Sequence, residues 1–431
     1  MNNFKEEQLC VAIVSEHASA RFGGEAVLPL HYFLFLRKRG VDSWLIVHER
    51  TRHELEQTIS PQDKNRVMYT RDTWLHRALW KFGSCFPHRI RCATTGALMH
   101  LITQHMQRRV VKGMVKSHGV NIVHEPIPVS PKQPSLMYKV GAPVIIGPMN
   151  GGMTFPPAFQ AMESRTERAA VWIGRKLSGV ANLLVPGKRH ASLLLVANER
   201  TARALPPLLK APVQYLVENG VDLTVWKPAD ARERPQKSGE AIRFVFMGRM
   251  IPLKAIDLLL RAFHKLTLEL PTHELHLDLL GDGSDRCRLE ELATHLGLEN
   301  GVQFHGFLPQ SQCAQILKEC DAFVMPSLCD CGGAVVLESM AMGIPVIATN
   351  WGGPADYLDD TCGILVEPSS EEELVDGFAC AMKKIVDNPE LIGRLSRNGM
   401  EKARTEYDWE IKAGLMVEHY LSVIDVGTPP D

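Results

Sequence analysis

The chain has 431 residues, of which 45% are hydrophobic and 23% charged, and its formal net charge is -1. This balance is typical of a soluble globular protein, and it excludes a disordered chain or a strongly basic nucleic-acid-binding protein. The chain is longer than one hydrophobic core ordinarily serves, and its length suits two domains of about 200 residues each. We therefore expect two domains with a cleft between them.

The segment MNNFKEEQLC at the start is polar and acidic, which predicts no secretory signal, and no apolar run is long enough to span a bilayer. The ten cysteines are scattered, without disulfide-dense spacing, which indicates reduced thiols. Cys329 and Cys331 lack a second Cys or His pair with zinc-finger spacing, so we expect no structural metal. These features predict a cytoplasmic protein.

Short apolar, β-branched runs alternate with amphipathic stretches of helical period, which is the pattern of parallel β/α units. In the first half of the chain, strands are expected at 10–14, 43–47, 120–124, 143–147 and 192–197. The same alternation of apolar runs and amphipathic stretches begins again after a polar stretch. The second set of strands is expected at 242–248, 275–281, 302–306, 321–326, 345–349 and 363–367.

The polar stretch from Lys227 to Glu240 is the predicted linker. We therefore expect an N-terminal domain at 1–226 and a C-terminal domain at 227–405. The amphipathic run that follows belongs to no β/α unit, and we expect a helix at 406–424 that completes the first domain. Residues 425–431 carry no pattern and are predicted to be disordered.

The most informative segment covers residues 326–358, PSLCDCGGAVVLESMAMGIPVIATNWGGPADYL. After the strand at 321–326, Gly332 and Gly333 open a helix that is predicted from about Ala334 to Met342. Free backbone N–H groups and the helix dipole both favour an anion at such a helix start. A diphosphate would fit there.

Two carboxylates bracket this helix start. Asp330 lies in the preceding loop, and Glu338 lies one turn inside a helix that is otherwise apolar. A single carboxylate is most often a helix-start residue or a solvated helix position. A carboxylate within an apolar helix needs a partner, however, which favours a ligand contact for Glu338.

The segment FVFMGRMIPLKAIDLLLRAF, residues 244–263, supplies a cationic turn. Its strand ends at Gly248, its helix is expected to start near Lys254, and Arg249 and Lys254 flank the turn. Either charge alone is more often a surface group. Their placement at the carboxyl end of a parallel strand favours contact with a leaving diphosphate, whose negative charge grows as the glycosidic bond breaks.

At these residues the chain resembles the retaining glycosyltransferases of family 4. The resemblance covers nearly the whole chain and extends to the motifs GGEAVLPL near the start, GPMNGG at 147–152, ENGVDL at 218–223, LGDG at 280–283 and FHGFLP at 304–309. It implies an α/β protein of the GT-B fold, in which two Rossmann-like β/α/β domains face each other across a cleft and the C-terminal helix crosses back to the N-terminal domain.

The resemblance also assigns roles. It implies that Arg249 and Lys254 hold the diphosphate, that Glu338 hydrogen-bonds the ribose hydroxyls, and that His124 lies near the reacting sugar, although a lone histidine is more often structural. The catalytic set is therefore predicted as Asp330, Glu338, His124, Arg249 and Lys254. The predicted substrate-binding set, in which glycines permit close backbone approach, is Gly23, Gly24, Asn150, Gly151, Asn219, Gly248, Gly281, Cys331, Gly332, Gly333, Ala334 and Val335.

The sequence departs from the family pattern in two places. Asp330 stands where the family has the first of two glutamates, and Ala255 stands where a glycine usually follows the lysine. The second change is expected to tighten the turn after Lys254. Neither removes a charge, so activity is expected.

The activity that the resemblance implies is transfer of a sugar from a GDP-, UDP- or ADP-linked donor to a glycan or lipid-linked acceptor, with the leaving phosphate taking the acceptor proton. No carboxylate pair suggests a retaining glycosidase's nucleophile and acid. No Asp-x-Asp motif is apparent, so neither a metal nor another cofactor is expected. The alternatives are a GT-B nucleotide-sugar epimerase and a catalytically silent sugar-nucleotide-binding protein. A nicotinamide dehydrogenase is the weakest, because SEHASARFGG replaces a G-x-G-x-x-G turn after the first strand.

A basic stretch lies between Thr73 and His124, where no Asp or Glu occurs. Its basic residues include Arg77, Lys81, Arg89, Arg91, Arg108, Arg109, Lys112 and Lys116, and they are interleaved with Trp74, Trp80, Phe82 and Phe86. This composition suits peripheral contact of residues 74–116 with anionic lipid at the inner face of a membrane. It equally suits a solvated basic helix whose aromatic side chains lie in the core.

Overall fold

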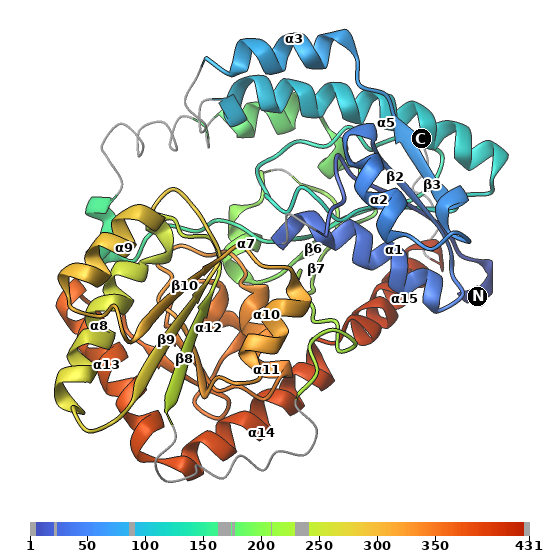
Figure 1. The fold of residues 1–431 in the computed structure, drawn as a ribbon. Coiled ribbons are helices and arrows are strands. Elements are labelled where there is room, and N and C mark those ends of the chain that lie inside the picture. Colours follow the sequence, from blue (N-terminus) through green and yellow to red (C-terminus); the bar gives the residue numbers. More distant parts are fainter. Residues whose placement is uncertain are drawn as a thin grey trace. The chain divides into compact units, whose positions relative to one another are not determined.

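The computed structural model describes residues 6–20, 24–85, 91–162, 174, 177–207, 209–228 and 241–425. The chain divides into two units (Figure 1). Unit 1 holds the described residues up to Gly152, those between 174 and 218, and those from Lys412. Unit 2 holds residues 153–162 and Asn219–Ile411. The predicted tail at 425–431 lies outside the described residues except for Asp425.

Unit 2 begins before the predicted boundary at 226. The reason is backbone pairing: Val221 donates its N–H to the Tyr407 carbonyl at 2.8 Å, and Trp409 donates to the Val221 carbonyl at 3.2 Å. Residues 153–162 also join unit 2, because Phe155 and Phe159 are buried in its hydrophobic core. Neither contact leaves a periodic signal in the sequence.

Unit 1 is built on a parallel sheet of seven strands in the order β3-β2-β1-β4-β5-β6-β7. Their bounds are β1 Cys10–Val14, β2 Asp42–His48, β3 Val67–Thr70, β4 Ile122–Glu125, β5 Val144–Met149, β6 Leu193–Val196 and β7 Val213–Tyr215. The five predicted strands are confirmed, because each is apolar and buried. The edge strands β3 and β7 were not predicted.

The helices of unit 1 connect these strands. They are α1 Leu28–Lys38, α2 Arg52–Thr58, α3 Trp74–Gly83, α5 Ala97–Ser117 and α7 Glu199–Ala204, with a further helix at 177–184. The last helix, α15 Trp409–Asp425, returns to unit 1 from Lys412, as predicted. Its buried Lys412 ammonium donates to the Val217 carbonyl. Among the described residues, no helix has both the length and the apolar character needed to cross a bilayer.

Unit 2 carries a parallel sheet of six strands in the order β10-β9-β8-β11-β12-β13, and all six were predicted. The strands are β8 Ile242–Met247, β9 Leu275–Leu280, β10 Val302–Gly306, β11 Ala322–Met325, β12 Val346–Thr349 and β13 Gly363–Val366. The helices are α8 Ile256–Glu269, α9 Arg286–His295, α10 Gln310–Leu317, α11 Ala334–Ala341, α12 Gly353–Tyr357, α13 Glu371–Asp387 and α14 Pro389–Glu406.

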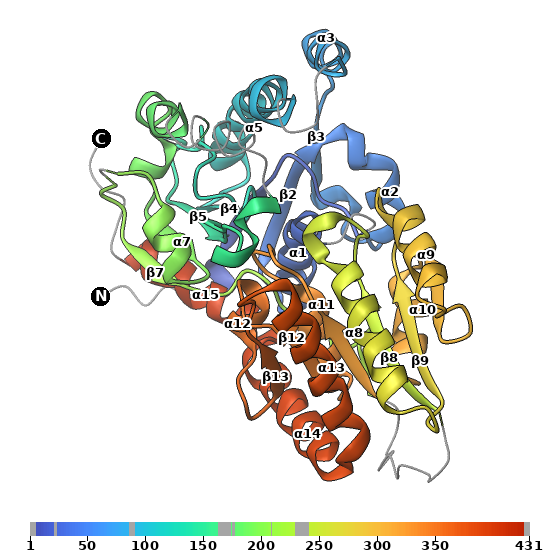
Figure 2. The same cartoon turned by 90° about the vertical axis from the view of Figure 1, so that its left-hand side faces the viewer.

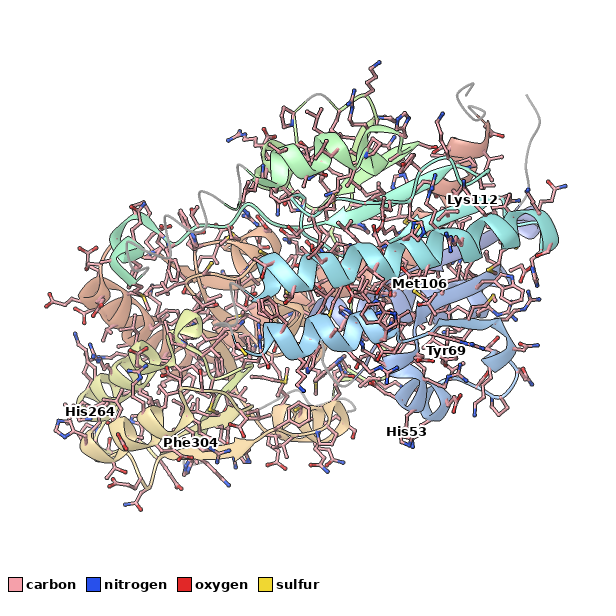
Figure 3. The ribbon with its side chains drawn as sticks, turned by 90° about the horizontal axis from the view of Figure 1, so that it is seen from above. His53, Tyr69, Met106, Lys112, His264 and Phe304 are labelled. Atoms are coloured by element: carbon pink, nitrogen blue, oxygen red, sulfur yellow. The ribbon has the colours of Figure 1, made fainter. Side chains whose placement is uncertain are left out.

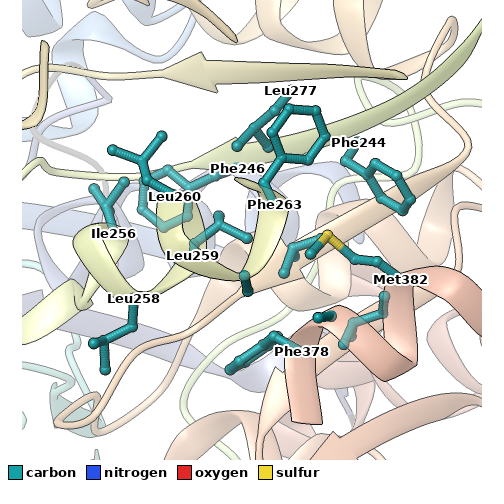
Figure 4. Close-up of a cluster of buried hydrophobic side chains, with 14 of the residues drawn as sticks. Phe244, Phe246, Ile256, Leu258, Leu259, Leu260, Phe263, Leu277, Phe378 and Met382 are labelled. Carbon is teal, nitrogen blue, oxygen red and sulfur yellow. The ribbon is translucent and has the colours of Figure 1, made fainter. Parts of the chain in front are cut away.

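The core of unit 2 forms where α8 and α13 cover the sheet (Figure 4). On α8, Ile256, Leu259, Leu260 and Phe263 recur at helical spacing and are buried. Phe263 packs edge-on against Phe244 of β8, with 6.3 Å between ring centroids. Burying one such side chain contributes about 1.5–3 kcal/mol, so this packing fixes the position of β8 and of the turn that follows it.

Each sheet is built outward in both directions from its first strand. In unit 1 the chain adds β2 and β3 on one side of β1 and then β4 on the other side; in unit 2 it adds β9 and β10 on one side of β8 and then β11 on the other side. The switch points therefore lie between β1 and β4 and between β8 and β11. Ligands of parallel α/β sheets bind outside the carboxyl ends of the strands at such a switch point. In unit 2 this edge carries the predicted cationic turn, after β8, and the predicted carboxylate loop, after β11.

Candidate functional site

The turns after β8 and β9 are in direct backbone contact. Gly248 donates its N–H to the Leu280 carbonyl at 2.9 Å, and Met250 donates to the Asp282 carbonyl at 2.9 Å. Gly281 has φ +129°, and a Cβ added there would lie 1.9 Å from the Gly248 oxygen. Only glycine fits at that position. Gly248 and Gly281 therefore shape the cationic turn, and contact between either of them and a donor remains a prediction.

Ala255 explains why the helix begins later than predicted. Residues Pro252–Lys254 form a 3-10 turn, Ala255 adopts the left-handed conformation with φ +48°, and α8 begins at Ile256. An L-residue with a side chain is uncommon at positive φ. A glycine, which usually follows the lysine in the family that this chain resembles, would adopt this conformation without strain.

Ala255 allows a first test of this geometry. Ala255→Gly should change the stability by less than about 1 kcal/mol, because relief of the left-handed strain opposes the added chain entropy and the lost buried methyl group. Ala255→Val should lower it by more than about 2 kcal/mol, since a β-branched residue is a genuine outlier at positive φ. Thermal melting of both variants measures this difference, and a well-tolerated valine would contradict the assigned conformation.

Lys254 forms an ion pair with Asp330, in which its ammonium donates to Oδ2. Both side chains are largely buried, with 13% and 22% of their surface exposed. The two loops are also joined through their backbones, because the Leu328 N–H donates to the Leu253 carbonyl at 3.0 Å. The structure thus brings together two predicted residues that are far apart in the sequence. Asp330 orients Lys254 rather than standing as a separate carboxylate.

The start of α11 follows this ion pair directly. Gly333 is its N-cap with φ +126°, and no side chain of the described residues caps the first turn. The preceding loop is supported from behind: Gly353 donates its N–H to the Asp330 carbonyl at 2.9 Å, and a Cβ added at Gly353 would lie 1.7 Å from the Gly332 oxygen. The predicted cradle at Cys331, Gly332, Gly333, Ala334 and Val335 therefore has a fixed backbone, with Arg249 exposed on the neighbouring turn.

Glu338 lies in the second turn of α11, between the buried Leu337 and Ser339. Its carboxyl is partly buried, and no hydrogen bond within the described part of the chain offsets this burial, which raises its pKa to about 8. An unpaired carboxyl in apolar surroundings is costly unless a ligand supplies the missing donors. A pair of ribose hydroxyls would supply them.

His124 is held by hydrogen bonds within unit 1. It lies fully buried in β4, where its Nε2 lies 2.7 Å from the Gly147 carbonyl and its Nδ1 lies 2.8 Å from the Tyr420 hydroxyl of α15. Burial lowers the pKa of the imidazole to about 4, so the ring is neutral at pH 7. Nε2 therefore donates to Gly147 and Nδ1 accepts from Tyr420. Both ring nitrogens thus have partners inside the protein, and a catalytic role for His124 remains a prediction.

Three further predicted residues also have partners inside the protein. The Gly151 N–H donates to the Thr201 hydroxyl at 3.0 Å, and that hydroxyl lies 3.3 Å from Asn150 Oδ1, so both residues join β5 to α7. In unit 2, Asn219 is buried and donates to the Tyr357 hydroxyl at 3.0 Å. Substrate contact at these positions stays a prediction.

The glycine pair near the start is only half described. Gly24 is exposed, has φ +53° and begins the 3-10 turn Gly24–Val27 before α1. The positive φ accounts for a glycine at this position. Gly23 lies outside the described residues, so the approach of this pair to donor and acceptor remains a prediction.

One cluster within the described residues has metal-ligating side chains. His48, Asp72 and His76 of unit 1 offer ligand atoms within 4.8 Å of one another. Two of these atoms are already engaged: Asp72 Oδ1 lies 3.3 Å from Arg50 Nη2, and His76 Nδ1 accepts from the Thr73 N–H at 3.2 Å. A metal would have to displace these contacts.

A cavity of about 250 Å³ lies in unit 2 at the amino ends of β8, β9 and β10, where Arg243, His276 and Val302 line it. This is the sheet edge opposite the cationic turn. Because ligands of parallel sheets bind at the carboxyl ends, we do not assign the donor to this cavity.

Residues 229–402 match the family model described as glycosyl transferases group 1. The matched region lies within unit 2. It includes the cationic turn, the Lys254–Asp330 pair and Glu338, so the residues brought together in unit 2 all belong to the matched region.

The curated relatives that match include D-inositol 3-phosphate glycosyltransferases. The one from Thermobispora bispora is 32% identical over 247 residues, which cover 54% of this chain and 56% of the relative. The one from Rhodococcus jostii is 33% identical over 220 residues, which cover 48% and 46%. The chain thus spans about half the length of the curated relatives it matches.

Solved structures resemble the chain over nearly its whole length. Sucrose-phosphate synthase from Thermosynechococcus elongatus has a TM-score of 0.65 at 18% identity and covers 97% of this chain and 100% of its own. Anabaena HepE, solved in complex with UDP, has a TM-score of 0.63 at 16% identity, with coverage of 96% and 100%. These likenesses establish the fold: two Rossmann-like domains with parallel sheets, of the GT-B type, as predicted.

Proposed function

We propose that this chain is a retaining glycosyltransferase that moves a sugar from a nucleotide-diphosphate donor to a glycan or lipid-linked acceptor in polysaccharide or glycoconjugate biosynthesis. The observation that carries the proposal is the juxtaposition in unit 2 of the Lys254–Asp330 pair with the start of α11, on which Glu338 has no hydrogen-bond partner among the described residues. The glycosyl transferases group 1 match and the UDP complex of Anabaena HepE support it.

In this proposal the leaving group is stabilised by fixed positive charge. Lys254, Arg249 and the backbone N–H groups at the start of α11 would face the diphosphate, whose charge develops as the glycosidic bond breaks. Asp330 would keep Lys254 in place before the donor arrives, and Glu338 would accept the ribose hydroxyls. Since this turn supplies the positive charge, we expect no metal requirement.

Retention needs no protein nucleophile in this scheme. The acceptor would attack the face that the diphosphate leaves, and the departing phosphate oxygen would take the acceptor proton. The anomeric configuration of the first product, read from its proton NMR coupling constants, tests this part alone. Inversion would refute the retaining mechanism and leave the donor site untouched.

A thermal-shift panel of UDP, GDP and ADP, each with its monophosphate, tests the donor class. A ligand that binds only the folded state adds about 2.7 kcal/mol of apparent stability at one hundred times its Kd. We expect one diphosphate to raise the melting temperature by several degrees and its monophosphate by less, since the second phosphate reaches the cationic turn. No shift with any diphosphate at millimolar concentration would contradict the proposal.

Turnover separates the transferase from the other activities considered. A transferase consumes its donor mainly when an acceptor is present, an epimerase converts the donor without one, and a silent binding protein shows a thermal shift without turnover. We place the enzyme in the cytoplasm, at the inner face of a membrane if its acceptor is lipid-linked. Contact of residues 74–116 with anionic lipid belongs to this proposal.

A further inference from the structure

Helix α3 is attached to unit 1 by one face only. On its inner face, His76 Nε2 lies 3.0 Å from the Thr103 hydroxyl of α5, and a Cβ added at Gly83 would lie 2.4 Å from the Thr95 hydroxyl oxygen. The Thr73 hydroxyl and the His76 ring form a capping box at its start. These contacts fix the helix beside α5, as Figures 2 and 3 show.

The outer face of α3 is apolar. Trp74, Ala78 and Phe82 recur every four residues, which places them on one stripe, away from the buried His76 and Gly83. Trp74 is 74% exposed and Phe82 63% exposed. Trp80 is 57% exposed. For these three described aromatic residues, the predicted alternative of a place in the core is therefore wrong. Phe86 and Arg89 lie outside the described residues.

Basic side chains surround this stripe. Arg77 and Lys81 are exposed on α3, and Arg109, Lys112 and Lys116 are exposed on the neighbouring α5. Lys112 is labelled in Figure 3. Two arginines of the stretch are engaged within the protein. Arg108 donates to the Tyr138 carbonyl at 2.9 Å and stacks on the Tyr138 ring, and the Arg91 guanidinium lies 5.3 Å from the centre of the Trp80 ring. No acidic residue occurs between Thr73 and His124. Asp72, just before this segment, lies 3.8 Å from Arg77 and offsets part of that one charge.

A second exposed apolar helix lies on the other side of α5. It is the green helix at 177–184 in Figures 2 and 3. Its exposed side chains are Leu177, Val180, Leu183 and Leu184. Unit 1 thus presents two helices with exposed apolar side chains, separated by a basic helix.

We propose that α3, the basic side chains of α5 and the helix at 177–184 dock unit 1 on the surface of an anionic lipid bilayer. Exposed tryptophan and phenylalanine beside Lys and Arg are the side chains that enter the headgroup region and bind its negative charge. A second copy of this chain fits less well, because two surfaces with the same positive charge would meet. The inference deepens the contact of residues 74–116 with anionic lipid that the proposed function includes, and it rests on that function in making the acceptor lipid-linked.

Vesicle co-sedimentation of the full chain tests the proposal without donor or acceptor, so its outcome is independent of the donor site. The vesicles contain phosphatidylcholine alone or with about one third phosphatidylglycerol, at low and at 0.5 M salt, because 0.5 M salt shortens the screening length of surface charges to about 4 Å. We expect sedimentation with the anionic vesicles at low salt and at least about tenfold weaker binding at high salt or without the anionic lipid.

Two double variants separate the apolar from the charged contribution. Trp74→Ser with Phe82→Ser removes the stripe, and Arg77→Glu with Lys81→Glu reverses its charges; each should weaken binding to anionic vesicles at least about tenfold. The matched controls in unit 2 are Phe307→Ser, which replaces an aromatic residue that is 68% exposed, and Arg394→Glu. Both controls should bind as the unmodified chain does. Thermal melting shows whether each variant is folded.

Three results would overturn the proposal. The first is absence of sedimentation with every vesicle, and the second is equal binding by the α3 variants and the controls. The third is concentration-dependent dimerisation that the Trp74→Ser, Phe82→Ser variant abolishes while vesicles bind nothing, since this would assign the surface to a second copy.

Discussion

Lys254→Ala should lower kcat at saturating donor by at least about 100-fold, the loss that follows removal of one preorganised donor to a developing negative charge. The substitution removes one of the cations proposed to stabilise the leaving diphosphate. It also leaves the Asp330 carboxylate unpaired at the start of α11, where it would repel the phosphates. Because Asp330 is partly exposed, water can solvate it, and the variant should remain folded.

Product formation and thermal melting of the same preparation measure this effect. The matched control is Lys383→Ala, which breaks an exposed ion pair with Glu269 at 3.0 Å in unit 2 and should leave kcat unchanged. Near-normal turnover of Lys254→Ala would count against the assigned role of the cationic turn. A comparable loss in the control would show that the effect is not specific to the site.

At pH 9, where the Glu338 carboxyl is ionised, Glu338→Gln should weaken binding of the nucleoside diphosphate about 10- to 100-fold, the range for hydrogen bonds to a charged group. The same substitution should stabilise the ligand-free protein at high pH. The folded-state pKa of Glu338, about 8, lies above the ordinary value of 4.5. Between these values the folded state holds more protons, so stability falls as pH rises through this window. The glutamine variant lacks this loss.

Titration calorimetry and thermal melting at pH 5 and pH 9 measure both effects. The melting temperature of Glu338→Gln minus that of the unmodified chain should be larger at pH 9 than at pH 5. The exposed Glu291→Gln on α9 is the control, and it should change neither affinity nor pH dependence. Unchanged affinity with an unchanged pH slope would remove Glu338 from the site.

The strands were predictable where burial demanded apolar residues. Every expected run in unit 2 and five in unit 1 form strands, because strands covered by helices on both faces are continuously apolar. The edge strands β3 and β7 escaped prediction. The sequence of β7, Val213–Tyr215, is short and exposed at all three positions, so it carries no hydrophobic signal.

The cationic turn and the carboxylate loop were predictable as a pair because β8 and β11 are neighbours, which brings their carboxyl ends to one place. The Lys254–Asp330 ion pair was not, since side-chain contacts leave no pattern in spacing. The left-handed Ala255 and the support that Gly353 gives to Gly332 also depend on close backbone approach.

His124 shows that a position at a strand end does not by itself determine the partners of a side chain. A histidine at the carboxyl end of a parallel strand was expected to face a ligand. Tyr420 of α15 instead occupies one ring nitrogen, and it comes from a helix 296 residues further along the chain. The amphipathic sequence of α15 predicts a helix, but it does not indicate which strand of unit 1 that helix packs against.

The most direct test of the central claim is a crystal structure of the chain with the nucleoside diphosphate that gives the largest thermal shift. We predict phosphate oxygens within hydrogen-bond distance of Lys254 Nζ and the first N–H groups of α11, and ribose hydroxyls on the Glu338 carboxylate. A diphosphate bound elsewhere, for example in the cavity at the amino ends of β8, β9 and β10, would contradict it.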